Sequence, residues 1–134
     1  GKYRNVIPNF INKAFKNKTI EIHGAGKSTR DFTYVLDFVK VIEKILLSPK
    51  KFNHIYNFGA SKKIKIISLA KKIIKMTHSN SKIKFIPIRK WDKFSNRKAK
   101  NNKLMKNFKN FKFTKIDHGL KQTVDWFKDL KDFK

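Results

Sequence analysis

The sequence has 134 residues, 40% of them hydrophobic, which is enough for a single domain, residues 1–134, with a buried core. Its 34 basic and 9 acidic side chains give a net charge of +25, and it has no cysteine. This composition excludes disulfide bonds and thiolate metal sites, and the chain lacks the long apolar run of a membrane span. We therefore expect a soluble, cytoplasmic protein without a membrane partner.

The first half of the chain begins with helical periodicity and then alternates like a strand. In order, we predict a helix over 5–17, a strand over 19–23, a glycine-punctuated turn over 23–28, an extended segment over 31–35 and a helix from 35 to about 48. The last helix is predicted from apolar residues that recur with helical spacing, namely Val35, Phe38, Val39, Ile42 and Leu46.

The second half repeats the mixture of short strands and amphipathic helices. We predict a strand over 54–58, a helix over 66–76, a strand over 82–86, a loop over 87–101, and helices over 102–108 and 118–130. The loop has no clean period, which is typical of a segment with a binding role. The pattern as a whole predicts an α/β or α+β fold.

Several chemical motifs are weak. Residues 24–29 resemble the end of a phosphate-binding P-loop, but Glu21 stands where that motif needs its first glycine, so a tight turn is the better interpretation. The four histidines lack metal-ligand spacing. The few acidic residues, among them Asp31 and Asp37, are interpreted as helix caps or partners of lysine. We therefore predict neither a metal site nor catalytic residues.

The high positive charge has two interpretations. A basic chain attracts nucleic acid, so a small protein that binds nucleic acid non-specifically is the alternative function. However, 30 of the 34 basic residues are lysine, and Lys, Asn, Ile and Phe make up 71 of the 134 positions. All four are encoded by codons rich in A and T, and the lysines are spread along the chain. Biased composition therefore accounts for the charge without a specific nucleic-acid partner.

Six phrases occur in a fixed order along the chain. They are residues 5–10 (NVIPNF), 22–26 (IHGAG), 30–35 (RDFTYV), 56–59 (YNFG), 87–92 (PIRKWD) and 119–126 (GLKQTVDW). Together they resemble the C-terminal portion of the extended short-chain dehydrogenase/reductase family, the NAD-dependent nucleotide-sugar epimerases and dehydratases. The resemblance extends from about residue 5 to residue 127. It implies the C-terminal segment of a Rossmann-type enzyme, with its cofactor-binding half absent.

The resemblance also implies a substrate site. Asn5, Val6 and Asn9 would begin a helix beside the nucleotide, and Glu21, Ile22 and His23 would form a strand edge along the base. Arg30 and Arg89 would hold the diphosphate, Asn57 would support the nucleotide or its ribose, and Arg97 is a further candidate. A guanidinium fork meets two phosphate oxygens at once, where an ammonium meets one. The expected ligand is a UDP- or dTDP-sugar.

The family's cofactor motifs are not present in these 134 residues. Tyr3, Tyr34 and Tyr56 are each followed four positions later by an apolar residue, so no Tyr-x-x-x-Lys pair exists, and no GxGxxG or GxxGxxG turn occurs. We therefore expect NAD in the complete enzyme but none bound by this segment. The expected partner is an N-terminal Rossmann half or a homologous subunit, and no activity is expected without it. A degraded gene product without function is a third possibility.

Overall fold

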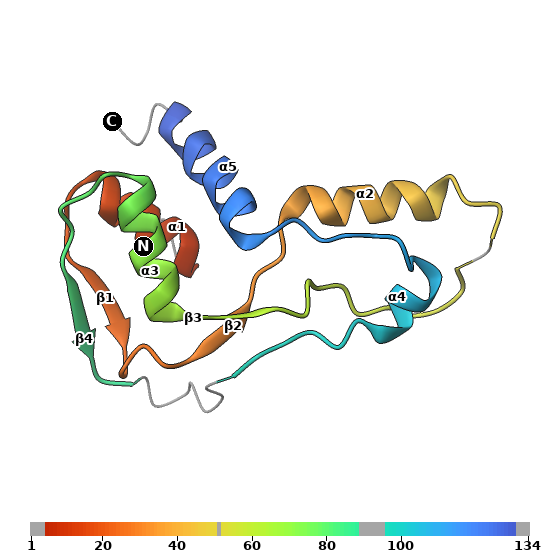
Figure 1. Cartoon of the computed structure of the whole chain (residues 1–134), viewed down its shortest axis with the longest axis horizontal. Helices are drawn as coiled ribbons and strands as arrows, with labels where there is room; N and C mark the ends of the chain where they lie inside the picture. Colours follow the sequence, from red (N-terminus) through yellow and green to blue (C-terminus); the bar gives the residue numbers. More distant parts are fainter. Residues whose placement is uncertain (1–4, 51, 89–95, 131–134) are drawn as a thin grey trace.

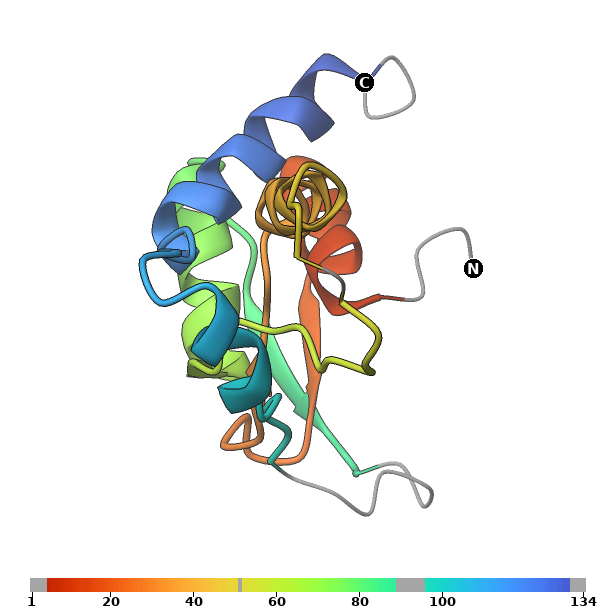
Figure 2. The same cartoon turned by 90° about the vertical axis from the view of Figure 1, so that its right-hand side faces the viewer.

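The computed structural model describes residues 5–50, 52–88 and 96–130, and these form two regions of different character (Figure 1). The first, here called the lobe, contains α1 (Val6–Phe15), β1 (Ile20–His23), α3 (Ile66–Met76), β4 (Ile83–Ile86) and α5 (Ile116–Asp129). The second, here called the arm, contains α2 (Val35–Leu46), residues 52–58, α4 (Asn102–Asn107) and residues 108–115. The arm extends away from the lobe and points toward the viewer in Figure 2.

The lobe is built on a pair of parallel strands. β1 and β4 pair in register from Ile20 opposite Ile83 to His23 opposite Ile86. Ile20 and Ile22 are buried whereas Glu21 is exposed, so the strand alternates between core and solvent as its sequence predicts. Helices α1 and α3 lie side by side on one face of this pair (Figures 1 and 2).

The hydrophobic core lies where these helices and α5 meet the sheet. Its buried members all belong to the lobe: Phe10, Ile11, Ala14, Ile20, Ile22, Leu69, Ala70, Ile73, Leu120, Val124 and Phe127. The predicted apolar faces of the helices over 5–17, 66–76 and 118–130 are thereby confirmed, as are the strands over 19–23 and 82–86. The mixed α/β prediction is correct.

A short antiparallel ladder joins the lobe to the arm. β2 (Thr29–Asp31) pairs with β3 (Lys63–Lys65), with Arg30 opposite Ile64. The extended segment predicted over 31–35 is misplaced, because pairing with β3 ends at Asp31 and α2 begins at Val35. The turn before β2 is confirmed: Gly24 and Gly26 have φ of 65° and 68°, which glycine adopts without steric cost.

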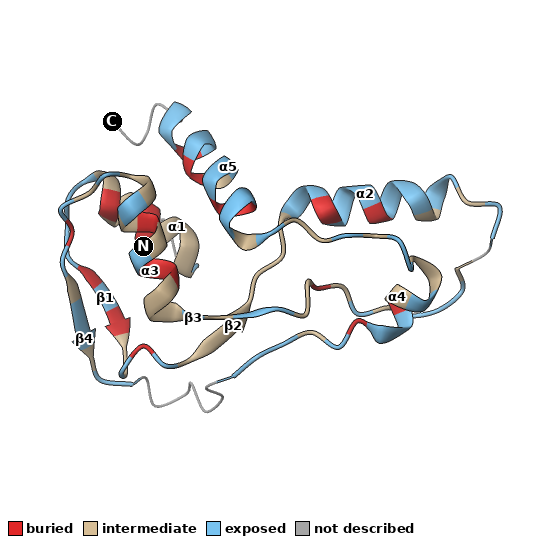
Figure 3. Cartoon of the chain, in the orientation of Figure 1, coloured by how far each residue is buried: buried red, intermediate tan, exposed pale blue. Residues whose placement is uncertain are grey.

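The arm exposes much of its apolar surface. α2 has the predicted bounds, but its only fully buried side chains are those of Asp37 and Val41 (Figure 3). The strand predicted over 54–58 is wrong for the described residues, since this segment bends at His54 and pairs with no strand in them. Across the described ranges, no helix is long and apolar enough to span a membrane.

Candidate functional site

The end of β1 contacts the start of the segment that carries Arg89. His23 Nδ1 lies 2.8 Å from the carbonyl oxygen of Pro87, a hydrogen bond in which the ring donates. Ile22 is buried in the core, so only its backbone is placed to meet a ligand. The edge of β1 opposite β4 carries no other strand within the described ranges. The strand predicted over residues 19–23 therefore forms as β1, and the side chain of Ile22 packs in the core.

Glu21 is the charged member of this edge. Its Oε2 accepts a hydrogen bond from Lys13 Nζ on α1 at 2.9 Å. This hydrogen bond, followed by the charge of Lys13, holds the pKa of Glu21 below its usual range. Glu21 is thus an ionised, paired side chain on the solvent face of the strand.

Arg30 and Arg97 lie on neighbouring segments. Arg30 is half-buried on β2, and its Nη1 donates to the carbonyl oxygen of Thr29 at 2.9 Å. The backbone N–H of Arg97 donates to the same oxygen at 3.2 Å. Thr29 Oγ1 also donates to Asn96 Oδ1 at 2.7 Å, and the two residues form a parallel bridge. Thr29 therefore connects β2, which carries Arg30, to the backbone of Arg97.

Arg89 lies outside the described residues, as do residues 90–95. The described residues on either side of this stretch are both attached to the same part of the fold. Pro87 accepts a hydrogen bond from His23 at the end of β1, and Asn96 bridges Thr29 at the start of β2. The β1–β2 connection thus holds both flanks of the segment that contains Arg89.

Asp31 connects three segments next to Arg30. Its Oδ2 accepts hydrogen bonds from the backbone N–H groups of Ser61 at 2.9 Å and Ala99 at 3.1 Å, and its Oδ1 accepts one from Lys62. The interpretation of Asp31 as a helix cap or lysine partner is therefore wrong. The sequence contains no signal for this role, because the donors are backbone groups far away along the chain.

Gly59 belongs to the same junction. Its carbonyl oxygen accepts a hydrogen bond from buried Asn101 Nδ2 at 2.6 Å, and a Cβ added at Gly59 would lie 2.4 Å from Ala99 Cβ. Only a glycine permits the two segments to approach this closely. Asn57 is two residues away and exposed, so the predicted nucleotide contact lies at the edge of this junction.

The remaining predicted residues lie on α1. Asn5 is exposed at the N-cap position, where its side chain makes no capping hydrogen bond, and its carbonyl accepts from the N–H of Asn9. Val6 and Asn9 are half-buried on the first turns of the helix. These three residues are therefore placed by α1, whereas Arg30 is placed by β2.

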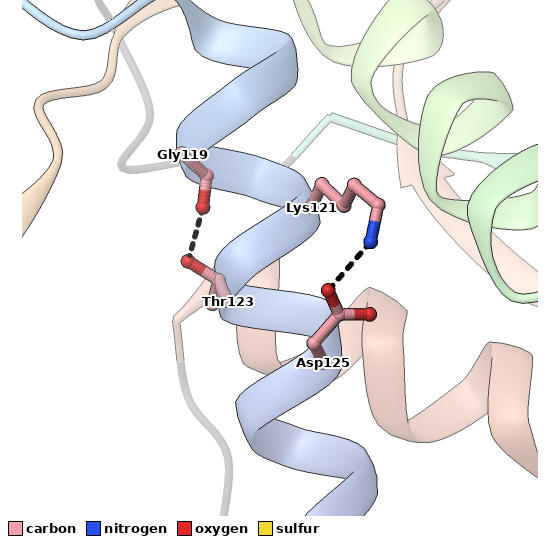
Figure 4. Close-up of polar contacts among 4 residues, drawn as sticks. All are labelled: Gly119, Lys121, Thr123 and Asp125. Atoms are coloured by element: carbon pink, nitrogen blue, oxygen red, sulfur yellow. Dashed lines mark hydrogen bonds and ion pairs between the residues drawn. The ribbon is translucent and has the colours of Figure 1, made fainter.

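Polar groups on α2 and α5 find their partners within the described part of the chain. The carboxylate of Asp37, buried on α2, accepts hydrogen bonds from Thr114 N at 2.8 Å and Thr114 Oγ1 at 2.7 Å, so it is neither a cap nor a lysine partner as interpreted above. On α5, Thr123 Oγ1 donates to the Gly119 carbonyl and Lys121 pairs with Asp125 (Figure 4). These polar groups are satisfied within their own helix.

Two cavities are lined by residues of the arm. One of about 530 Å³ lies among Lys44 and residues 106–112, and one of about 440 Å³ runs along α2. Neither includes a predicted site residue. Among the described residues, no group of three or more His, Asp or Glu side chains is placed to hold a metal ion.

Comparison with known proteins identifies similar chains. The sequence model described as "NAD dependent epimerase/dehydratase family" matches residues 1–59. UDP-N-acetyl-alpha-D-glucosaminuronate decarboxylase of Bacillus cytotoxicus is 34% identical over 138 residues, which cover 98% of this chain and 42% of that protein.

The fold is also similar to that of solved epimerase structures. An epimerase of Methanothermobacter thermautotrophicus is similar with a TM-score of 0.87 and 28% identity, over 96% of this chain and 38% of its own. UDP-N-acetylglucosamine 4-epimerase of Methanobrevibacter ruminantium, solved in complex with UDP-N-acetylmuramic acid, has a TM-score of 0.81 and 28% identity, over 96% and 40%. The chain thus spans about two fifths of the length of the relatives that it matches.

Proposed function

Because the chain belongs to the NAD dependent epimerase/dehydratase family, we propose that it forms the part of such an enzyme that binds a UDP- or dTDP-sugar. The observation that carries the proposal is the pairing at β2, where Thr29 brings Arg30 and the backbone of Arg97 together. The segment with Arg89 is attached at both flanks to the same connection. In this proposal the guanidinium groups of these arginines bind the several oxygens of a diphosphate, which a planar fork can meet two at a time.

The rest of the nucleotide is assigned to neighbouring elements. We propose that the base lies along β1, against the backbone of Glu21 and Ile22 and the ring of His23, and that Asn57 supports the ribose. In the same proposal Asn5, Val6 and Asn9 line the approach along α1. The intact core beneath β1 supports this assignment, because a rigid strand presents its edge in a fixed geometry.

NAD belongs to the complete enzyme of this family, where it accepts and returns a hydride. The residues present here do not fit that cofactor, since they include neither a glycine-rich dinucleotide turn nor a Tyr-x-x-x-Lys pair. No hydride-transfer step is therefore derived for this chain. We propose that its own residues bind and orient the substrate and that the chain alone does not turn over.

The arginines provide the test. In an enzyme reconstituted from this chain and an NAD-binding partner, Arg30→Ala and Arg89→Ala are each expected to weaken UDP binding more than tenfold, measured by titration calorimetry. Arg30→Lys should recover only part of the loss, because it keeps the charge but not the fork. Lys71→Ala on the exposed side of α3 removes the same charge and serves as the matched control.

Two outcomes would contradict the proposed substrate site. Unchanged UDP affinity in both arginine variants would remove the site assignment. Binding that falls steeply with salt and is as strong for random duplex DNA as for UDP would favour the non-specific nucleic-acid alternative instead.

A further inference from the structure

Residues 106–112 carry a short repeat that the proposed function does not use. The sequence reads Lys-Asn-Phe twice and then Lys, so Lys106, Lys109 and Lys112 recur at every third position. An asparagine and a phenylalanine stand between each pair of lysines. Each repeat therefore offers an ammonium group, an amide and an aromatic ring.

The repeat curves around a cavity. α4 ends at Asn107, and the N–H of Phe111 donates to the carbonyl oxygen of Phe108 at 2.9 Å, which closes a turn. Residues 108–115 then return from α4 toward α5 (Figure 1). The curved repeat and Lys44 of α2, which is far away along the chain, together line the cavity of about 530 Å³.

Aromatic packing fixes part of the cavity wall. Phe108 stacks on Phe52, with ring centroids 5.5 Å apart and ring planes 10° from parallel. Phe111 packs edge to face against Phe113, with centroids 5.1 Å apart. Phe108 and Phe111 both line the cavity. Flat apolar surface therefore lies in a held position beside the ammonium groups of the repeat.

The charge around the cavity has one sign. Half of the eight lining residues are lysine and none is Asp or Glu, whereas lysine makes up less than a quarter of the whole chain. Among the described residues, no carboxylate forms an ion pair with these four lysines. Biased composition accounts for the number of lysines in the chain but not for their convergence on one cavity.

The chemistry of the lining favours one class of ligand. Like charges around a concave surface add their potentials and raise the local concentration of anions. Each ammonium group has three rotatable donors, so lysines from different positions can meet the oxygens of one oligophosphate from several sides. A phenylalanine ring accepts a nucleobase by stacking. The volume of the cavity lies within the range of about 300–1,000 Å³ that is usual for small-molecule sites.

We propose that this cavity, here called the lysine cavity, binds a small nucleotide with two or more phosphate groups. Lys106, Lys109 and Lys112 bind the phosphate oxygens together with Lys44 from α2, and the base lies against the phenylalanine rings of the repeat. None of the lining residues belongs to the proposed substrate site. The lysine cavity is therefore a second nucleotide site, and its occupant connects α2 to the segment that follows α4.

A single strand of nucleic acid is a poorer occupant. Such a strand is bound along a continuous basic groove in which successive bases stack on successive aromatic side chains. Here the turn between Phe108 and Phe111 bends the repeat around one cavity instead of extending it into a track. A ligand with its phosphates close together matches this curved arrangement better than a long backbone does.

The test uses the reconstituted enzyme described above, saturated with NAD and UDP so that the cofactor site and the substrate site are occupied. ATP and tripolyphosphate are then titrated by calorimetry. We expect one ATP to bind per chain, and the combined change Lys106→Gln, Lys109→Gln and Lys112→Gln, here called the cavity triple, should raise its Kd at least tenfold. ATP should bind at least fivefold more tightly than tripolyphosphate, because only ATP has a base that can stack.

A second triple variant controls for net charge. Lys71→Gln, Lys75→Gln and Lys82→Gln together remove the same three charges from exposed positions of the lobe and should change the Kd of ATP less than twofold. The lysines of the cavity triple are exposed as well, so both variants should melt as the unchanged protein does in circular dichroism. On addition of ATP, hydrogen exchange should slow in residues 102–112 and stay unchanged in α1.

Four results would overturn the proposal: no ATP bound by the saturated enzyme, equal losses in the two triple variants, tripolyphosphate bound as tightly as ATP, or single-stranded oligouridylate bound at the lysine cavity more tightly than ATP. The proposed function is tested separately, because the cavity triple should leave UDP affinity unchanged. If ATP binding depends on the cavity triple but UDP affinity does not depend on Arg30, the lysine cavity stands and the substrate assignment fails.

Discussion

The lobe and the arm contain helices of similar amphipathic character whose apolar side chains are buried in the lobe and largely exposed in the arm. α3 places Leu69, Ala70 and Ile73 fully inside the core, whereas α2, equally amphipathic, leaves Ile42 and Leu46 in solvent. Burial of apolar area is the main source of stability, so the lobe, with its eleven-residue core, contributes more folding energy than the arm, where Val41 and Leu104 are buried. A helical apolar pattern therefore predicts a helix but does not specify what covers the apolar face of that helix.

The largest effect is expected from a matched pair of isoleucines. Ile73→Ala in α3 should lower the free energy of unfolding by about 2–5 kcal/mol, because it opens a cavity at a fully buried side chain. Ile42→Ala in α2, where the side chain is 38% exposed in the isolated chain, should change it by about 0.5 kcal/mol or less. Urea denaturation followed by circular dichroism measures both. Equal losses would mean that the arm shares the stability of the lobe.

An intermediate effect is expected within the arm. Asp37→Ala removes both hydrogen bonds to Thr114, which tie α2 to residues 108–115. Removing a buried carboxylate that accepts two hydrogen bonds should lower the local opening free energy of the arm by about 1–3 kcal/mol. Hydrogen exchange should then accelerate in α2 while exchange in α3 stays unchanged.

The control for this experiment is Asp125→Ala on α5, which removes an exposed carboxylate paired with Lys121. Its loss should leave exchange in α2 as it was, since surface ion pairs contribute little. Acceleration in α3 as large as in α2 after Asp37→Ala would show that the two regions unfold as one unit.

The smallest effect is expected at the surface of the lobe. Lys13→Met should raise the pKa of Glu21 toward its ordinary value, measured by NMR titration of the glutamate side chain. Because the folded-state pKa is the lower one, the contribution of the pair is present above the ordinary glutamate pKa. It is lost as the pH falls through the folded pKa. Lys18→Met is the control and should leave Glu21 as it is; a pKa of Glu21 indifferent to Lys13 would refute the contact.

Sequence periodicity predicts the lobe well because its elements bury their own apolar faces. The bounds of α3 and the register of apolar residues in β1 follow directly from local pattern. The pattern fails at residues 54–58, where strand propensity is present but no neighbouring strand among the described residues is available for pairing. A strand depends on a partner, and that partner is not written in the local sequence.

In the candidate site, too, some residues can be predicted from the sequence and others cannot. The arginines are predicted from the chemistry of diphosphate recognition and from family resemblance, and the structure places the backbone N–H of Arg97 against Thr29. The site's assignment stays a prediction. The role of Asp31 was missed, because an aspartate that accepts backbone hydrogen bonds looks like any other aspartate in the sequence.

The junction at Asp31 has a consequence for how this protein tolerates change. Every donor to its carboxylate is a backbone amide, so the side chains at Lys62 and Ala99 contribute nothing to those bonds. Exposed Lys62, which supplies only an amide, accepts most replacements except proline, whereas asparagine at position 31 would have the same length but only one accepting oxygen. The connection between lobe and arm therefore depends on the Asp31 carboxylate itself and not on the side chain of Lys62.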